Sequence, residues 1–260
     1  MSSLLQVSNI TKRFQGLVAV NDLSLTMEHR TIHALIGPNG AGKTTTINLI
    51  TGVTPLTSGE VQLDGKTISG LPTFQVARSG IGRTFQNIKV FPSMTLLENV
   101  MVGGHEIAPM GILKGLFNMR GAQKEEKLLK EKAEQILDYI GMYKWKDELM
   151  ENLPYGRQKI SELARALMTG PKLILLDEPA AGLNPSERSE LVKVIMKVYE
   201  DGTDFFLIEH NMDVIMKISS KITVLNFGSK IAEGTPKEIQ NNDEVIKAYL
   251  GRKYQAQSQN

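Results

Sequence analysis

Short apolar runs alternate with longer amphipathic segments along most of the chain. Four of these runs are followed by turn-forming or acidic residues, at 33–36, 173–176, 205–208 and 222–226. The alternation is typical of parallel strands whose two faces are covered by helices. The pattern therefore predicts an α/β core in which these four runs are strands.

Two regions depart from this pattern. Residues 4–27 contain short alternating segments around Gly16 and Asn21, which predict antiparallel strands in a small side sheet. Between residues 88 and 150 the strand signal fades, and apolar residues recur at helical spacing at Leu129, Ala133, Ile136, Leu137 and Ile140. We therefore predict a core at 1–87 and 151–250, a helical subdomain inserted at 88–150, and a polar tail at 251–260. The Gly- and Met-rich stretch 101–122 supports no firm assignment.

Composition narrows the class of protein. The 260 residues are 41% hydrophobic and 22% charged, which excludes a disordered or fibrous chain. The 30 basic and 28 acidic side chains give a net charge of +2, so bulk electrostatics gives no reason to expect a nucleic acid partner. The chain has no cysteine, which excludes disulfides, thiolate metal sites and a cysteine nucleophile.

The sequence shows neither a secretory signal at its start nor an apolar run long enough to span a bilayer. We therefore expect a protein that stays in the cytosol. If it acts at a membrane, we expect it to do so through a partner.

A phosphate-binding loop follows the first predicted core strand. Residues 37–44 read GPNGAGKT and match G-x-x-x-x-G-K-[ST] between a strand and an apolar-periodic segment, the context that this motif requires. The glycines let backbone N–H groups turn toward phosphate oxygens, and the helix N-terminus adds partial positive charge. A Gly-rich turn that only caps a helix is the alternative. The motif predicts nucleotide binding by Asn39, Gly40, Ala41, Gly42, Lys43, Thr44 and Thr45, with Lys43 on the phosphates and the Thr44 hydroxyl on Mg²⁺.

An acidic pair follows another predicted strand. Asp177 and Glu178 come directly after the run 173–176. A carboxylate at a strand end can supply a second oxygen ligand to a metal on the triphosphate, and its neighbour can polarise the attacking water. Strand-end residues that cap the next helix are the alternative. We predict Asp177 as a metal ligand and Glu178 as the catalytic base.

These motifs together resemble one family. Residues 153–158 read LPYGRQ, Gly156 stands 21 positions before Asp177, and His210 follows a further predicted strand. This arrangement resembles the ATP-binding subunits of ABC transporters over nearly the whole chain. The resemblance implies an α/β fold: a RecA-like P-loop NTPase core, an N-terminal antiparallel β subdomain and a helical subdomain insertion. It also implies ATP and Mg²⁺ as cofactors.

The resemblance assigns roles to further residues. Phe14 would stack on adenine and Ala19 would lie beneath the ribose or base; a core phenylalanine beside a turn is the alternative. Gln86 would contact Mg²⁺ or the lytic water. His210 would bind the γ-phosphate, although a lone histidine is more often structural.

Residues 153–157 (LPYGR) stand where this family has its signature motif, usually L-S-G-G-Q, and they depart from it. Pro154 replaces serine and offers neither a hydroxyl nor an N–H, Tyr155 replaces the first glycine, and Arg157 stands where glutamine is usual. The amides of Tyr155 and Gly156 remain as donors to a nucleotide held by the opposite subunit. We therefore predict a half-site that grips ATP less well than that of its partner, within a heterodimer; a homodimer is the other possibility.

Several segments are similar to the ATPase subunit of importers for branched-chain (hydrophobic) amino acids, namely 83–87 (RTFQN), 177–185 (DEPAAGLNP), 208–212 (IEHNM) and 248–251 (AYLG). Urea or short-amide importers and the lipopolysaccharide-export ATPase share much of this pattern, and a soluble P-loop ATPase or kinase is the alternative outside transport. The resemblance implies a second ATPase subunit, two transmembrane permease subunits, indirectly an extracytoplasmic solute-binding protein, and a place on the cytoplasmic face of the membrane.

Overall fold

The computed structural model describes residues 3–84, 86, 88–104 and 119–249. Its main sheet is the predicted α/β core, in the strand order β10-β9-β3-β8-β7-β6. The strands are β3 (Ile32–Ile36), β6 (Ile81–Arg83), β7 (Leu173–Asp177), β8 (Asp204–Ile208), β9 (Lys221–Asn226) and β10 (Ser229–Gly234). All pair in parallel except β10, which is antiparallel to β9.

The continuous apolar runs explain this sheet. Every residue of β3, β7 and β8 is buried, as expected when helices or a second sheet cover both faces. The four predicted strands are confirmed within one residue at each end. Strands β6 and β10 were not predicted, because the three residues of β6 give too short a signal and no residue of β10 is fully buried.

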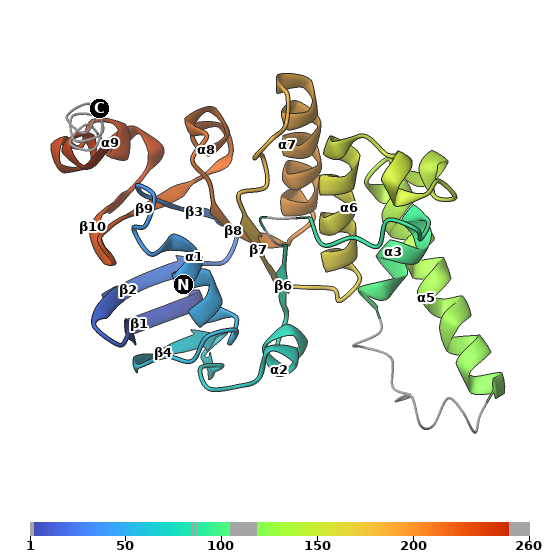
Figure 1. Ribbon diagram of the computed structural model, residues 1–260, viewed down its shortest axis with the longest axis horizontal. Coiled ribbons are helices and arrows are strands. Elements are labelled where there is room, and N and C mark those ends of the chain that lie inside the picture. The colour runs from blue at the N-terminus through green and yellow to red at the C-terminus, as the bar shows by residue number, and fades with distance from the viewer. Residues whose placement is uncertain (1–2, 85, 87, 105–118, 250–260) are drawn as a thin grey trace.

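A second, antiparallel sheet lies beside the first, as the N-terminal pattern predicts (Figure 1). Its strands run in the order β2-β1-β4-β5 and are β1 (Ser3–Phe14), β2 (Leu17–Glu28), β4 (Ser58–Leu63) and β5 (Lys66–Thr67). Apolar side chains of this sheet pack with helix α1 (Lys43–Ile50) and with one face of the main sheet, where Phe206 and Leu35 are fully buried. This second core supports the segment that carries the phosphate loop.

Helices cover the other face of the main sheet. Residues Ile174 and Phe205 of the strands share one core with Leu163 of α6 (Tyr155–Leu167) and Ile195 of α7 (Pro185–Glu200). Helices α8 (Met212–Ile218) and α9 (Pro236–Gln240) contribute to the same core, whereas Val76 of α2 (Thr73–Arg78) packs in the core of the antiparallel sheet. The predicted apolar stripe of α6 is confirmed.

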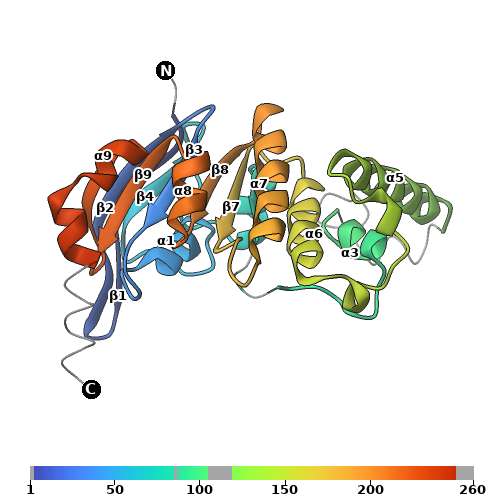
Figure 2. The ribbon, with the colours of Figure 1, turned by 90° about the horizontal axis from the view of Figure 1, so that it is seen from above.

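The helical region extends away from the sheets beyond α6 (Figure 2). It contains α3 (Leu96–Val102), α5 (Met119–Tyr139) and two single 3-10 turns, η1 (Tyr143–Trp145) and η2 (Met150–Asn152). Ala133 and Leu137 of α5 are fully buried, which confirms the helical spacing. Part of the Gly- and Met-rich stretch 101–122 and the whole predicted tail 251–260 lie outside the described residues. Across the part of the chain that the structure describes, no helix is both long and apolar enough to cross a bilayer.

Candidate active site

The phosphate loop joins β3 to α1 and is shaped by its glycines. Gly42 caps α1 with a φ of 101°, a left-handed conformation that a side chain rarely adopts. A Cβ at this position would lie 2.5 Å from the carbonyl oxygen of Ala19, so strand β2 leaves room for glycine alone. The loop therefore stays close to β2, and Lys43, Thr44 and Thr45 at the start of α1 line a cleft.

Lys43 is the charged group of this loop. Its side chain is buried, and its ammonium donates to the carbonyl oxygens of Gly37 at 2.7 Å and Pro38 at 3.1 Å. These two hydrogen bonds fix the position of the ammonium relative to the phosphate loop. A phosphate seated on the loop amides would meet a cation whose position is already set.

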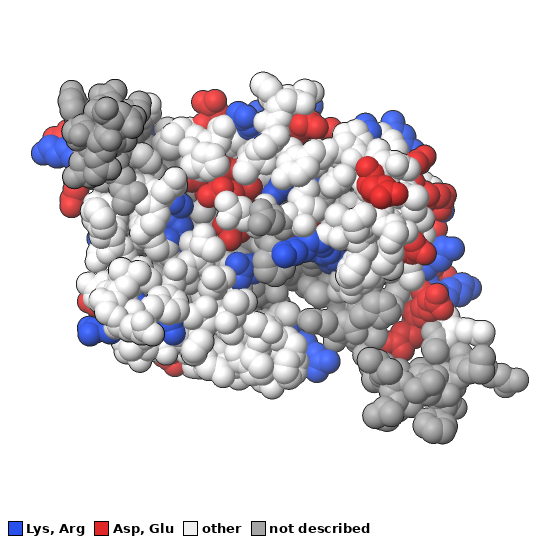
Figure 3. Space-filling view, in the orientation of Figure 1, with Lys and Arg blue, Asp and Glu red and all other residues white. Residues whose placement is uncertain are grey.

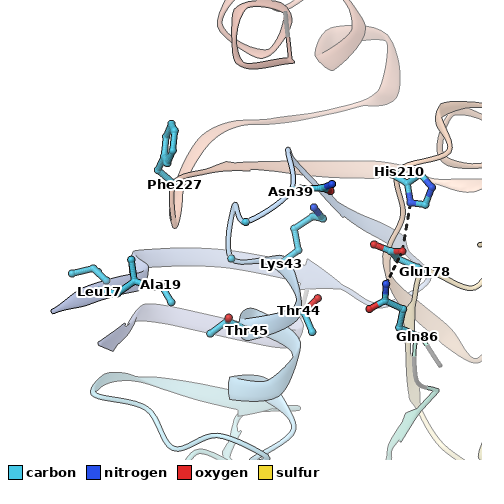
Figure 4. Close-up of a pocket in the computed structure, with 13 residues that line it drawn as sticks. Leu17, Ala19, Asn39, Lys43, Thr44, Thr45, Gln86, Glu178, His210 and Phe227 are labelled. Atoms are coloured by element: carbon cyan, nitrogen blue, oxygen red, sulfur yellow. Dashed lines mark hydrogen bonds and ion pairs between the residues drawn. The ribbon is translucent and has the colours of Figure 1, made fainter. Parts of the chain in front are cut away.

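A cleft of about 710 Å³ opens over the loop (Figure 4). Its lining includes many of the predicted residues: Ala19, Asn39, Gly40, Gly42, Lys43, Thr44, Thr45, Gln86, Glu178 and His210. Leu17, Val18 and Phe227 also line it, and the sequence analysis missed all three. The predicted residues Phe14, Ala41, Tyr155, Gly156 and Asp177 are not part of the lining.

Three polar side chains from distant segments meet at one end of the cleft (Figure 4). The Glu178 carboxylate accepts a hydrogen bond from Gln86 Nε2 at 3.1 Å and lies 3.7 Å from His210 Nδ1. Glu178 has a φ of 50°, a strained value for a residue with a side chain, and such strain clusters at functional sites. This arrangement can hold a water molecule next to a carboxylate base.

Asp177 ends β7 beneath these groups. Its carboxylate is almost fully buried and lies 3.7 Å from the guanidinium of Arg83, while Oδ1 has no hydrogen-bond partner among the described residues. Burial raises the pKa of the Asp177 carboxyl, and Arg83 opposes the shift. A buried carboxylate oxygen without a partner fits a divalent cation, which takes oxygen ligands.

Glu209 is a further residue that the sequence analysis did not single out. Its buried carboxylate accepts from the backbone N–H groups of Ala180 at 2.8 Å, His210 at 2.9 Å and Asn211 at 3.0 Å. It therefore ties the loop after Glu178 to the backbone of His210. Only its place after a buried strand could have indicated it, because its burial depends on the loop that folds over it.

Two charged residues of α6 hold the Gln86 segment. Lys159 Nζ donates to the Gln86 carbonyl oxygen at 2.9 Å, and Glu162 Oε1 accepts from the Lys89 N–H at 2.9 Å. Both side chains are buried, which lowers the pKa of Lys159 and raises that of Glu162. The sequence analysis missed these links, although both residues flank the apolar stripe of α6.

The signature residues lie away from the cleft of their own chain. Helix α6 begins at Tyr155, whose side chain is 43% exposed, and Pro154 provides no side-chain cap. The Gly156 N–H donates to Glu187 Oε1 at 3.3 Å. Asn184 caps α7 through its side chain, which accepts from the N–H groups of Ser186 and Glu187.

Phe14 also lies outside the lining. It pairs with Leu17 across the β1–β2 hairpin, and the ammonium of Lys12 lies 4.9 Å from its ring centroid. Its assigned role at the adenine stays a prediction.

The strand, phosphate loop and helix, together with the carboxylates at the end of β7, define a P-loop nucleotide-binding protein. The comparisons agree. The ABC transporter family model matches residues 20–181, and a model described as branched-chain amino acid ATP-binding cassette transporter matches 229–254.

Relatives match the chain over almost its whole length. It is 43% identical over 249 residues to the high-affinity branched-chain amino acid transport ATP-binding protein BraF of Pseudomonas aeruginosa, covering 95% of this chain and 98% of the relative. It is 33% identical over 252 residues to the lipopolysaccharide export system ATP-binding protein LptB of Haemophilus influenzae, covering 97% and 99%.

Solved structures show the same fold. An ATP-binding cassette of an ABC transporter in its ADP conformation superposes with a TM-score of 0.85 at 33% identity, covering 96% of this chain and 100% of that one. The chain belongs to the ABC transporter ATP-binding family, which confirms the predicted family and fold class. Members of this family bind nucleotide.

Proposed function

We propose that this chain is the ATP-hydrolysing subunit of an importer for branched-chain or other hydrophobic amino acids. The names of its relatives BraF and, at 43% identity over 249 residues, LivG of Salmonella typhimurium support the substrate class. The contact of Glu178 with both Gln86 and His210 carries the proposal of hydrolysis. A subunit that only bound nucleotide would not need a carboxylate placed beside the phosphate loop.

In this proposal the chain's own groups do the work around the γ-phosphate. Lys43 and the loop amides bind the phosphate oxygens, Glu178 accepts a proton from the attacking water, and Gln86 and His210 orient that water and the phosphate. Ala19 and Phe14 remain the predicted contacts of the nucleoside.

The groups around the Asp177 carboxylate suit Mg²⁺. Asp177 Oδ1, which has no hydrogen-bond partner within the described part of the chain, and the Thr44 hydroxyl would hold it with help from Gln86. Bound there, the metal would supply positive charge to the phosphate oxygens.

A second ATPase subunit completes the site in this proposal. The exposed Tyr155 lies outside the cleft of its own chain, where it is available to a nucleotide held by another subunit. The Gly156 N–H would exchange its bond to Glu187 Oε1 for one to that nucleotide. Because Pro154 caps α6 without a side-chain hydrogen bond, the contributed half-site has fewer donors than a serine-containing one. This difference favours a heterodimer over a homodimer.

A groove of about 380 Å³ lies between β6, α3 and α6, and its lining includes Lys89, Phe91 and Arg165. Phe91 is 48% exposed, and the same segment is held to α6 by Glu162. We assign this groove to a permease subunit, at the root of the proposed helical subdomain 88–150 and facing the proposed core 1–87 and 151–250. Through the two permeases the chain would sit on the cytoplasmic face of the membrane and serve a solute-binding protein outside.

Reconstitution of the whole transporter tests the proposal. The chain is purified with the second ATPase subunit and detergent-extracted permease subunits, placed in vesicles together with the solute-binding protein, and assayed for ATP-dependent uptake of labelled leucine, with urea and a short amide as comparison solutes. We expect co-purification and uptake of leucine alone. Uptake of urea or an amide instead would replace the substrate class, whereas failure to associate with any permease would favour a soluble ATPase or kinase.

A further inference from the structure

The turn between β9 and β10 carries an aromatic side chain in an unfavourable backbone conformation. Asn226 and Ser229 are paired, so Phe227 and Gly228 alone form the turn, with φ values of 45° and 81°. Two-residue turns with positive φ at both positions prefer asparagine followed by glycine, and a bulky residue at the first position is an outlier. Phe227 is also 72% exposed, so packing in a core does not compensate for the strain.

Backbone contacts hold this turn against the phosphate loop. The Gly228 N–H donates to the Ala41 carbonyl oxygen at 3.0 Å, and the Gly228 carbonyl oxygen accepts from the Asn21 N–H at 2.9 Å. A Cβ on Gly228 would lie 2.9 Å from the Ala19 carbonyl oxygen, so the approach needs glycine. The position of the Phe227 ring is therefore tied to the loop that receives the phosphates.

An apolar wall lies across the cleft from the turn that carries Phe227. Leu17 and Val18 of β2 are 65% and 37% exposed, and they line the same cleft as Phe227. Figure 4 shows Phe227 on one side of this end of the cleft and Leu17 and Ala19 on the other, with Lys43 further along. Exposed apolar side chains gathered around one opening indicate a ligand surface.

The two ends of the cleft therefore differ in chemistry. The polar lining side chains belong to the phosphate loop and the Gln86–Glu178–His210 group, whereas the lining residues at this end, among those the structure describes, carry apolar side chains. Such a surface can hold the face of a flat ring, and its described residues offer no side-chain donor or acceptor for the edge.

We propose that Phe227 forms one wall of the nucleoside subsite and stacks on the base of the bound nucleotide against Leu17 and Val18. This inference rests on the proposed function, since it needs a nucleoside triphosphate on the phosphate loop. The strained turn places an aromatic ring where the base arrives. Recognition is by the face of the base, so adenine and guanine gain similarly from the ring.

We call the arrangement of Phe227 against Leu17 and Val18 the clamp. Equilibrium dialysis of the full chain with ATP, GTP and inorganic tripolyphosphate, each with Mg²⁺, tests it. In Phe227→Asn, which suits a positive φ, we expect ATP and GTP affinity to fall on the order of 10-fold while tripolyphosphate affinity is unchanged. Phe227→Tyr should bind as the wild type does. The thermal midpoint of Phe227→Asn should be equal to or above that of the wild type, because the strain is relieved.

Two further variants complete the design. Phe74→Asn changes a half-exposed phenylalanine of α2 outside the cleft lining and should leave all three affinities unchanged. Phe14→Ala measures how much of the ATP affinity comes from Phe14, the aromatic residue that family resemblance assigns to the base.

An ATP affinity of Phe227→Asn equal to that of the wild type would overturn the clamp, as would an equal loss for tripolyphosphate, which would indicate damage to the loop. A wild-type chain that binds tripolyphosphate but not ATP would also overturn it. If the wild type binds none of the three ligands, the proposed function itself fails.

Discussion

The two ends of the polar part of the cleft are built in different ways. At one end, residues 37–45 are consecutive, and Lys43 donates to the carbonyl oxygens of Gly37 and Pro38 within the same loop. At the other end, Gln86, Glu178 and His210 come from segments that are 92 and 32 positions apart. The difference teaches that the phosphate-binding end is a local structure, whereas the hydrolytic end exists only once the sheet has formed.

The two ends of the cleft are also held in place by different kinds of contact. The phosphate loop is braced by glycine-tight contacts with β2 and with the turn at Gly228. The hydrolytic end depends on buried charged side chains: Glu209 beneath His210, and Lys159 and Glu162 beneath the Gln86 segment. A change at the first end should therefore abolish binding, and a change at the second should spare binding but slow the reaction.

Removal of the Lys43 ammonium should have the largest effect. Lys43→Ala loses the charge-assisted contacts to phosphate, each worth several-fold or more, so ATP affinity should fall on the order of 10²-fold or further. Equilibrium dialysis measures this loss, with Lys66→Ala, an exposed lysine of β5, as the control. Wild-type affinity in Lys43→Ala would show that the nucleotide lies elsewhere.

Glu178→Gln should separate the two ends most clearly. The amide keeps the shape of the side chain and can still contact Gln86 and His210, but it is no general base. ATP should bind normally while hydrolysis by the assembled transporter slows at least on the order of 10²-fold. Glu190→Gln, at an exposed position of α7, is the matched control for phosphate-release assays. A near-normal rate would move the base to another residue.

A smaller effect concerns the strand that leads into the phosphate loop. His33 of β3 is fully buried against Thr223, and burial lowers its pKa from 6.5 to about 4; Lys221 and Lys230 add to this shift and Glu233 opposes it. Below pH 6.5 the His33 imidazole is therefore protonated in the unfolded chain but stays neutral in the folded chain. The free energy of unfolding falls as the pH drops from 6.5 toward 4. At pH 5.5 the loss should be roughly 1 to 2 kcal/mol.

Urea unfolding at pH 7 and pH 5.5 measures this loss, and His33→Asn serves as the reference because it removes this imidazole alone. If the two proteins lose equal stability on acidification, His33 is not the group responsible.

The smallest effect is expected at the start of α6, the half-site that this chain would contribute to the nucleotide of the other subunit. Pro154→Ser restores a hydroxyl at the start of α6, which should strengthen ATP-driven association of the ATPase subunits by a few-fold. Analytical ultracentrifugation with ATP and the Glu178→Gln background measures the association. An unchanged association constant and unchanged transporter ATPase activity would remove the weak half-site from the proposal.

The sequence predicted the local features of this protein well. The four long core strands, the phosphate loop and the stripe of α6 follow from apolar periodicity and from a motif whose residues are neighbours in the chain. The sequence missed β6, which is too short, and β10, which has no fully buried residue. It also missed Glu209, Lys159 and Glu162, because burial of a charged side chain depends on which loop folds over it. The domain bounds and the roles of Phe14, Tyr155 and Gly156 stay predictions.

Apolar periodicity and the glycine, lysine and threonine of one loop determined the fold class and the position of the predicted phosphate loop, since neighbouring residues need only local backbone geometry to act together. Tertiary structure decided the rest. Parallel strands β7 and β8 end side by side, and this brings Glu178 and His210 within reach of each other. The turn at Phe227 likewise reaches the phosphate loop only because β9 pairs with β3.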